Sequence, residues 1–280
     1  MRINDNVHLI RKEFFVTSSV KRFVNVYLIE GRHCYLVDCG VAGTETLIEE
    51  YLKTIGRSLD DLKGIFITHS HPDHIGAAAG IQRRSGCAVY APAKEDEWIE
   101  DIDRQFSDRP IPNFYKLLPE SVRISRQLED GNVISPENGI ELRAISTEGH
   151  SHGSMSYILN GELIFTGDAI PTSGDVPIFV DYNKSIKSLD LIKSIGGIKY
   201  ACPAWDAVYD KDKLDERILI AKEMLARLKE AAIQVESEFG DVYDDENILR
   251  IFKAAGMPDY SGNRLARISI EACLMGQDDG

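Results

Sequence analysis

Cysteine is scarce in this sequence, and no two cysteines form a close pair. Five are spread over 280 residues, an odd number without a CxxC motif. A disulfide framework is therefore not expected, and the better interpretation is reduced, buried thiols in a cytoplasmic protein. The five residues are Cys34, Cys39, Cys87, Cys202 and Cys273.

Long hydrophobic runs are also missing. No stretch approaches the roughly 20 apolar residues that a membrane-spanning helix needs. The first residues, MRINDNVHLIRKEFF, contain no long apolar run after their basic residues, so a secretory signal is not expected. These absences predict a cytoplasmic protein without a membrane partner.

Positive charge is in short supply. There are 32 Lys and Arg against 45 Asp and Glu, which gives a formal net charge of −13. Such a surface repels phosphate backbones and anionic lipid headgroups, so nucleic-acid partners are disfavoured and a small-molecule substrate is expected. The 43% of hydrophobic residues is ample for a core, and the length fits one large domain or a domain with an appendage.

Strand patterns dominate up to about residue 205, and helical spacing of apolar residues follows. Two β-rich runs, 24–30 and 33–38, are joined by Gly31-Arg32 and predict a hairpin, and Asn160-Gly161 predicts another. The other predicted elements are a helix from Thr44 as its N-cap to Ile55, a strand over 65–68, a helix over 75–84, a strand over 88–91, a helix followed by a long proline-stiffened loop over 94–130, a helix over 184–195 and a strand over 199–204.

Residues 69–74 read His-Ser-His-Pro-Asp-His, directly after the apolar run 65–68. In extended backbone alternate side chains point the same way, so His69 and His71 can face one point. Pro72 stiffens the following turn and helps to bring Asp73 and His74 to the same side. Imidazole and carboxylate together suit zinc, iron or manganese, and without a cation they would crowd unsatisfied polar groups.

Two further candidates come later in the chain. His150 lies in the glycine-flanked loop TEGHSHGS, and Asp168 ends the run LIFTGD. Glycines permit unusual dihedrals and a close backbone approach at a site. Either residue alone is weak evidence for a metal site. A lone aspartate at the end of a strand, for example, more often caps the next turn than binds a metal.

The order HSHPDH, GHS loop, FTGD strand end resembles the metallo-β-lactamase-fold superfamily of metallohydrolases, and VNVYLI…LVDCG resembles its opening hairpin. The resemblance covers about residues 24–206. It implies an α/β fold, a four-layer αββα sandwich with two metals at one edge of the sheets. We expect a catalytic domain over 1–206 and a C-terminal helical extension over 207–280 packed on it.

The resemblance also implies roles for the site residues. His69, His71 and His150 are expected to hold one divalent metal, zinc with iron or manganese as alternatives. A second metal is expected on Asp73 and His74, with Asp168 bridging both ions. Asp38 is expected to steady a ligand from behind by hydrogen bonding, and His152 is interpreted as a loop residue near the substrate.

The chain departs from the family pattern at the last ligand. The family supplies a histidine from a Pro-Gly-His turn, whereas this chain has Cys202-Pro203-Ala204-Trp205-Asp206 and places Trp205 in that register. Asp206 is the candidate replacement, since a carboxylate is a suitable ligand. The alternative is that Asp206 caps a turn and the second metal site is weak or empty.

The expected activity is hydrolysis of a small ester, thioester or lactone by a metal-activated hydroxide, which Asp73 can also orient. Tyr182 is a candidate oxyanion donor, with a packed tyrosine as the alternative. The helical tail is expected to form a lid, extra core packing or a homodimer contact. The alternative functions are a mononuclear iron enzyme that oxidises persulfides, a nuclease, and a binding module without catalysis.

Overall fold

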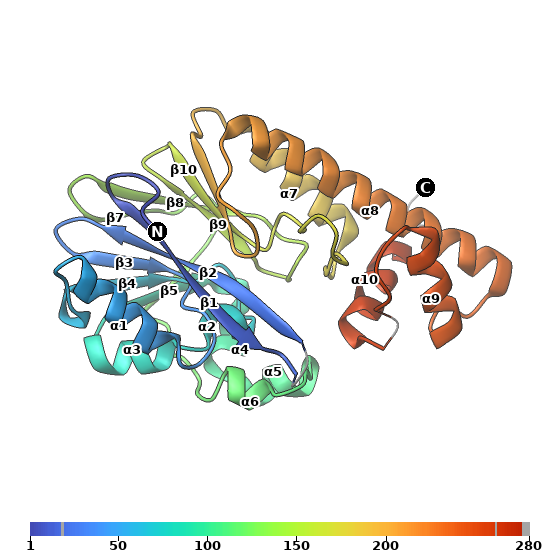
Figure 1. The fold of residues 1–280 in the computed structure, drawn as a ribbon, viewed down its shortest axis with the longest axis horizontal. Coiled ribbons are helices and arrows are strands. Elements are labelled where there is room, and N and C mark those ends of the chain that lie inside the picture. The colour runs from blue at the N-terminus through green and yellow to red at the C-terminus, as the bar shows by residue number, and fades with distance from the viewer. Residues whose placement is uncertain (18–19, 261, 276–280) are drawn as a thin grey trace. The chain divides into compact units, whose positions relative to one another are not determined.

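The first 130 residues form a mixed six-stranded sheet (Figure 1). Strands β1, β2 and β3 pair antiparallel, and β3, β4, β5 and β6 run parallel, in the order β1-β2-β3-β4-β5-β6. The strands are β1 Val7–Phe15, β2 Lys21–Glu30, β3 Cys34–Val37, β4 Leu62–Phe66, β5 Ala88–Pro92 and β6 Arg126–Leu128. The predicted hairpin of β2 and β3 is confirmed.

A second sheet has the strand order β11-β10-β9-β8-β7. Its strands are β7 Val133–Glu137, β8 Ile140–Ser146, β9 Met155–Leu159, β10 Leu163–Gly167 and β11 Tyr200–Pro203. The hairpin predicted at Asn160-Gly161 joins β9 to β10. Both turn residues have positive φ, 51° and 71°, which a two-residue turn of this kind requires and which Asn and Gly tolerate best.

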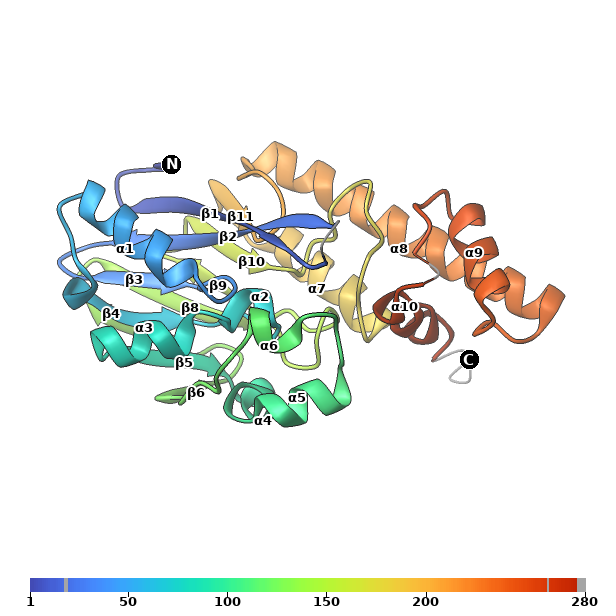
Figure 2. The ribbon, with the colours of Figure 1, turned by 60° about the horizontal axis from the view of Figure 1, so that its bottom comes forward.

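Side chains of β2 alternate between two cores. Tyr27 and Ile29 pack with residues of the second sheet, such as Tyr157 and Phe165, so the two sheets lie face to face. Val26 and Leu28 point to the opposite face, against residues of the helices α1 (Thr44–Thr54) and α3 (Ala78–Ser85). Figures 1 and 2 both show these two helices on the outer face of the first sheet.

Two local predictions about helices were wrong. Thr44 is the first residue of α1, not its cap: the N-cap is Gly43 with φ 84°, and the Thr44 hydroxyl donates to the Val41 carbonyl over 2.6 Å. The helix expected over 75–84 is broken into α2 (Pro72–Ile75) and α3. Gly76 lies at the break, and a side chain is excluded there because a Cβ would be 2.2 Å from the Leu117 carbonyl oxygen.

The segment 94–130 is more regular than predicted. Where a long loop was expected, short helices follow one another, and Asp101 caps α5 by accepting the N–H of Arg104 over 3.0 Å. Phe106, Phe114 and Tyr115 pack their rings together. The short elements of unit 1 are η1 Leu59–Asp61, η2 Ala93–Glu95, α4 Asp96–Glu100, α5 Ile102–Asp108 and α6 Phe114–Leu117.

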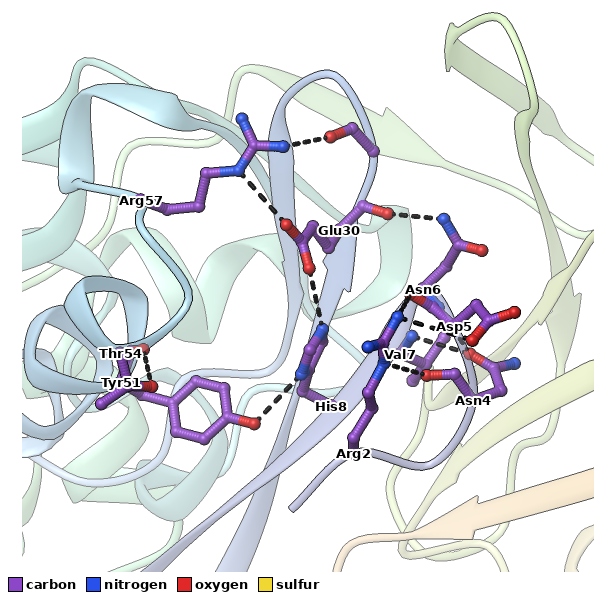
Figure 3. A network of polar contacts seen from close by, with 11 residues as sticks. Arg2, Asn4, Asp5, Asn6, Val7, His8, Glu30, Tyr51, Thr54 and Arg57 are labelled. Carbon is purple, nitrogen blue, oxygen red and sulfur yellow. Dashed lines mark hydrogen bonds and ion pairs between the residues drawn. The ribbon is translucent and has the colours of Figure 1, made fainter.

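A polar network links β1 to β2 and α1 (Figure 3). His8 is buried, with its Nδ1 3.0 Å from the Tyr51 hydroxyl and its Nε2 3.1 Å from Glu30 Oε2. Arg57 donates to the other oxygen of Glu30 over 3.3 Å. Burial lowers the pKa of His8, and the neighbouring Glu30 carboxylate opposes that effect.

The computed structural model describes residues 1–17, 20–260 and 262–275, and its backbone divides into two units. Unit 1 is Met1–Ser146, Gly153–Gly167 and Cys202–Val208, and unit 2 is Thr147–His152, Asp168–Ala201 and Tyr209–Gly280. Apolar residues such as Phe179, Leu225 and Phe252 form the core of unit 2. Its helices are α7 Tyr182–Ser194, α8 Lys211–Phe239, α9 Asp245–Ala254 and α10 Arg264–Leu274. The domain boundary at residue 206 stays a prediction.

The structure bears on the predictions that the cysteines form no disulfides and that no helix crosses a membrane. All five cysteines are free and buried, as predicted, and burial raises the pKa of Cys34 to about 11 and that of Cys273 to about 12. Such thiols stay protonated at neutral pH. Among the described residues, no helix combines the length and the apolarity needed to cross a bilayer.

Candidate metal centre

The motif HSHPDH lies in unit 1, at the carboxyl end of β4. His71 is the N-cap of α2 and keeps an extended backbone, and Pro72 opens the helix. Proline suits this first helical position because its missing N–H would have no partner there. His69, His71 and His74 are all buried. A buried strand, a five-residue connection and a short helix therefore bring three imidazoles out of solvent together.

The imidazoles of His69 and His71 approach each other closely. His69 Nε2 lies 3.0 Å from His71 Nδ1. Two nitrogens that share a tetrahedral zinc at 2.0–2.1 Å are separated by about 3.3 Å. The pair therefore fits a common cation, and its donors are of the kind that zinc and iron accept.

Asp38 orients the imidazole of His74. The carboxylate is buried, and it accepts the Thr68 N–H, the Thr68 hydroxyl and the Nδ1–H of His74, each over 2.8 Å. With Nδ1 protonated, the lone pair of His74 lies on Nε2, which is 3.3 Å from Asp73 Oδ2. Asp38 has φ 56°, a left-handed conformation that Asp tolerates better than most residues.

Thr68 fixes the tautomer of His69 in the same way. Its hydroxyl donates to Asp38, so the contact of 3.0 Å with His69 Nδ1 is an N–H donated to the hydroxyl oxygen. The lone pair of His69 then also lies on Nε2, the atom that faces His71. One buried carboxylate thus prepares two imidazoles for a cation.

His150 and Asp168 both belong to unit 2. His150 Nε2 lies 3.4 Å from Asp168 Oδ2, and Nδ1–H donates to the Ile178 carbonyl over 2.8 Å. That bond leaves the lone pair of His150 on Nε2. Gly149 has φ 127°, and a Cβ there would be 2.4 Å from the Ser185 nitrogen, so only glycine lets this loop lie against the start of α7.

Trp205 and Asp206 occupy the place of the departure from the family pattern, in unit 1. The Trp205 ring packs at 6.2 Å from Phe14, and its buried Nε1 has no hydrogen-bond partner among the residues that the structure describes. Asp206 Oδ1 accepts the N–H of Ala207 over 2.7 Å, as a turn cap would. A ligand role for Asp206 stays a prediction.

Tyr182 and His152 lie in unit 2. The Tyr182 ring packs under Lys229, with Nζ 4.4 Å from the ring centroid, and near Phe179 at 6.3 Å. Burial raises the pKa of the Tyr182 hydroxyl. This environment corresponds to the packed alternative, and an oxyanion role stays a prediction. His152 is exposed.

Sequence reasoning missed two polar residues beside the motif, Thr68 and Glu95. Thr68 immediately precedes the first histidine, and its position after an apolar strand was the available signal. Glu95 stands in the acidic run Glu95-Asp96-Glu97, where nothing distinguishes a buried carboxylate from an exposed one.

Comparison with known proteins identifies the family. The sequence matches the model of the metallo-beta-lactamase superfamily over residues 20–203. The probable polyketide biosynthesis zinc-dependent hydrolase BaeB of Bacillus velezensis is 31% identical over 157 residues, 56% of this chain and 59% of that protein. The hydroxyacylglutathione hydrolase of Thiobacillus denitrificans is 28% identical over 165 residues, 58% of this chain and 53% of that protein. The chain thus spans between half and two thirds of the length of these relatives.

Solved structures share the fold. A metallo-beta-lactamase family protein from Thermus thermophilus has a TM-score of 0.77 at 20% identity, covering 98% of this chain and 93% of that one. A beta-lactamase domain protein from Burkholderia ambifaria has a TM-score of 0.71 at 15% identity, covering 98% and 85%. The predicted αββα fold with C-terminal helices is confirmed. Because the superfamily model matches well over half of its residues, the chain belongs to the metallo-beta-lactamase superfamily.

Proposed function

We propose that this protein is a metal-dependent hydrolase of small esters, thioesters or lactones. In this proposal His69, His71 and His150 hold one divalent ion, and Asp73 and His74 hold a second, with Asp168 between them. Asp206 completes the second site in place of the usual histidine. Zinc is the first choice of metal, with iron or manganese as alternatives.

The observation that carries the proposal is the arrangement of donors in unit 1. The nitrogens of His69 and His71 are 3.0 Å apart, and Thr68 and Asp38 hold the lone pairs of His69 and His74 on Nε2. Two buried imidazoles whose lone pairs are set in this way, beside the third imidazole of His71, form a donor set that suits a divalent cation. In unit 2, the hydrogen bond from His150 to the Ile178 carbonyl prepares that lone pair too.

The metal would lower the pKa of a water molecule and polarise the substrate carbonyl. The chain's own residues would set the geometry. Asp38 would keep His74 in one orientation, and Thr68 would do the same for His69. Asp73 would also orient the attacking water, since its carboxylate is partly exposed beside His74. Tyr182 would donate to the developing oxyanion if its packing loosens.

The net charge of −13 repels the phosphate backbone of nucleic acids, which argues against nuclease activity. A small-molecule substrate is compatible with this charge. The names of the relatives support the same class: one is called a hydroxyacylglutathione hydrolase and another a zinc-dependent hydrolase. A cytoplasmic location and a homodimer stay predictions.

A second candidate is a mononuclear iron enzyme that oxidises persulfides. The specific observation in its favour is Trp205, which stands where the last metal-binding histidine is expected and packs against Phe14. Loss of that ligand weakens the case for two metals. One iron per chain with consumption of oxygen would support this candidate over hydrolysis.

Elemental analysis of the purified protein tests the proposal. We expect about two zinc ions per chain in the wild type and loss of metal in His71→Ala, with His33→Ala as the matched control. Hydrolysis is then measured on a panel of lactones, thioesters and phosphodiesters. Two ions bound at unchanged affinity in Asp206→Ala would remove Asp206 from the ligand set. Wild-type protein that takes up no metal would contradict the proposal as a whole.

A further inference from the structure

Glu95 is a buried carboxylate of unit 1 that the proposed chemistry does not use. Glu95 is the last residue of η2, the short helix that directly follows β5, and it is only 4% exposed. Its Oε2 accepts the backbone N–H of Ser70 over 3.1 Å and also the Ser70 hydroxyl. Its Oε1 accepts the N–H of Gly153 over 2.7 Å. A carboxylate this far from solvent needs such donors, because desolvation of its charge is otherwise prohibitive.

Ser70 is the residue between the two close histidines. Glu95 holds its N–H and its hydroxyl, and Gln105 Nε2 donates to its carbonyl over 2.6 Å. Every polar group of Ser70 is therefore fixed. Because Ser70 is bonded covalently to both His69 and His71, fixing its backbone limits how far either imidazole can move.

Gly153 follows His150 by three residues and precedes β9. A Cβ at this position would lie 2.6 Å from Lys94 Cβ and 3.0 Å from Glu95 Cγ. The backbone reaches Glu95 this closely only because residue 153 has no side chain. The same carboxylate thus anchors the chain near the carboxyl end of the TEGHSHGS loop.

We infer that Glu95 is a positioning residue for the metal centre, acting through Ser70 on one ligand loop and through Gly153 on the other. The inference rests on the proposed function, because it presupposes that the two loops carry ligands. Glu95 itself touches no metal or substrate in this scheme. Its two oxygens set the spacing between the backbone of Ser70 and the backbone of Gly153.

Glu95→Gln tests this role without changing the size of the side chain. One oxygen faces the Ser70 N–H and the other the Gly153 N–H, so an amide in either orientation turns its NH₂ group toward a donor. We expect zinc affinity, measured by competition with a chromogenic chelator, to fall by about 10- to 100-fold. The visible absorption of the Co²⁺-loaded protein should change as well. Glu97→Gln, on the exposed face of the same segment, is the matched control and should match the wild type.

Glu95→Asp keeps both acceptors on a shorter side chain and should recover part of the affinity. Ser70→Ala removes one hydrogen bond and should lower the affinity by a few fold, which tests the role even if Glu95→Gln fails to fold. Wild-type zinc affinity in a folded Glu95→Gln protein whose thermal stability is reduced would overturn the inference and leave a merely structural role. Wild-type protein that binds neither zinc nor cobalt would instead overturn the proposed function.

Discussion

The two groups of predicted ligands are held by different means. In unit 1, side chains orient the imidazoles: Asp38 bonds to His74, and Thr68 bonds to His69, all with little solvent exposure. In unit 2, the backbone does this work: the Ile178 carbonyl orients His150, and Gly149 allows the loop to lie against Ser185. The side chains of His150 and Asp168, at 10% and 12%, are more exposed than the three imidazoles of unit 1, although less exposed than Asp73 at 18%.

This difference predicts different vulnerabilities. A ligand oriented by a buried carboxylate is lost when that one side chain is removed, because several donors lose their acceptor together. A ligand oriented by backbone packing is lost when volume is added to the backbone contact. The largest loss is expected where buried donors lose their acceptor, a smaller loss where added volume causes a clash, and the smallest where only a pKa difference is removed.

The largest effect is expected for Asp38→Ala. The change strips the acceptor from the Thr68 N–H, the Thr68 hydroxyl and His74 Nδ1. We expect the free energy of unfolding in urea to fall by about 3 kcal/mol. Zinc affinity should fall as well. Asp60→Ala, at an exposed position, is the control, and equal stability of the two variants would show that the Asp38 network is dispensable.

Gly149→Ala tests the second group. The new Cβ would be 2.4 Å from the Ser185 nitrogen at φ 127°, so both a clash and strain arise, and we expect a loss of about 2 kcal/mol in the free energy of unfolding. Gly174→Ala has a positive φ of 85° but open space around it, and should lose only about 1 kcal/mol. If Gly174→Ala proves as damaging as Gly149→Ala, packing against Ser185 does not hold the loop.

The smallest effect concerns His8, a buried histidine outside both groups. Burial lowers its pKa, so the unfolded chain binds a proton at higher pH than the folded chain does. This contribution to stability is present above the unfolded pKa of about 6.5 and is lost as the pH falls through the folded value. Unfolding measured at pH 7.5 and 5.0 should show a smaller pH dependence in His8→Gln than in the wild type.

His33→Gln, at a partly exposed position, is the control for that comparison. Zinc affinity should be unchanged in His8→Gln, because His8 bonds to Tyr51 and Glu30 and belongs to neither ligand group. A weaker zinc affinity in this variant would show that His8 contributes to metal binding, and it would contradict the placement of His8 outside both ligand groups.

The ligand types were predictable because the information is local. HSHPDH places three imidazoles and a carboxylate within six residues, and Asn160-Gly161 specifies a two-residue hairpin by its own dihedral preferences. The β-rich run over 24–30 was predicted as a strand, but its division between two cores, with Val26 and Tyr27 on opposite faces of β2, came only from the structure.

What the sequence could not predict depends on partners distant in the chain. Glu95 looks like any exposed acid until Ser70 and Gly153 are brought to it. The need for glycine at residue 76 likewise depends on the close approach of the Leu117 carbonyl. Strand β1 was missed because charged residues such as Lys12 interrupt its apolar pattern, although the strand pairs fully with β2.

A crystal structure of the zinc-loaded protein, with the metal located by anomalous scattering, tests the central claim most directly. We expect one ion within about 2.0–2.1 Å of nitrogens from both His71 of unit 1 and His150 of unit 2. An ion held by unit 1 alone, with His150 too far away to bind it, would contradict the account.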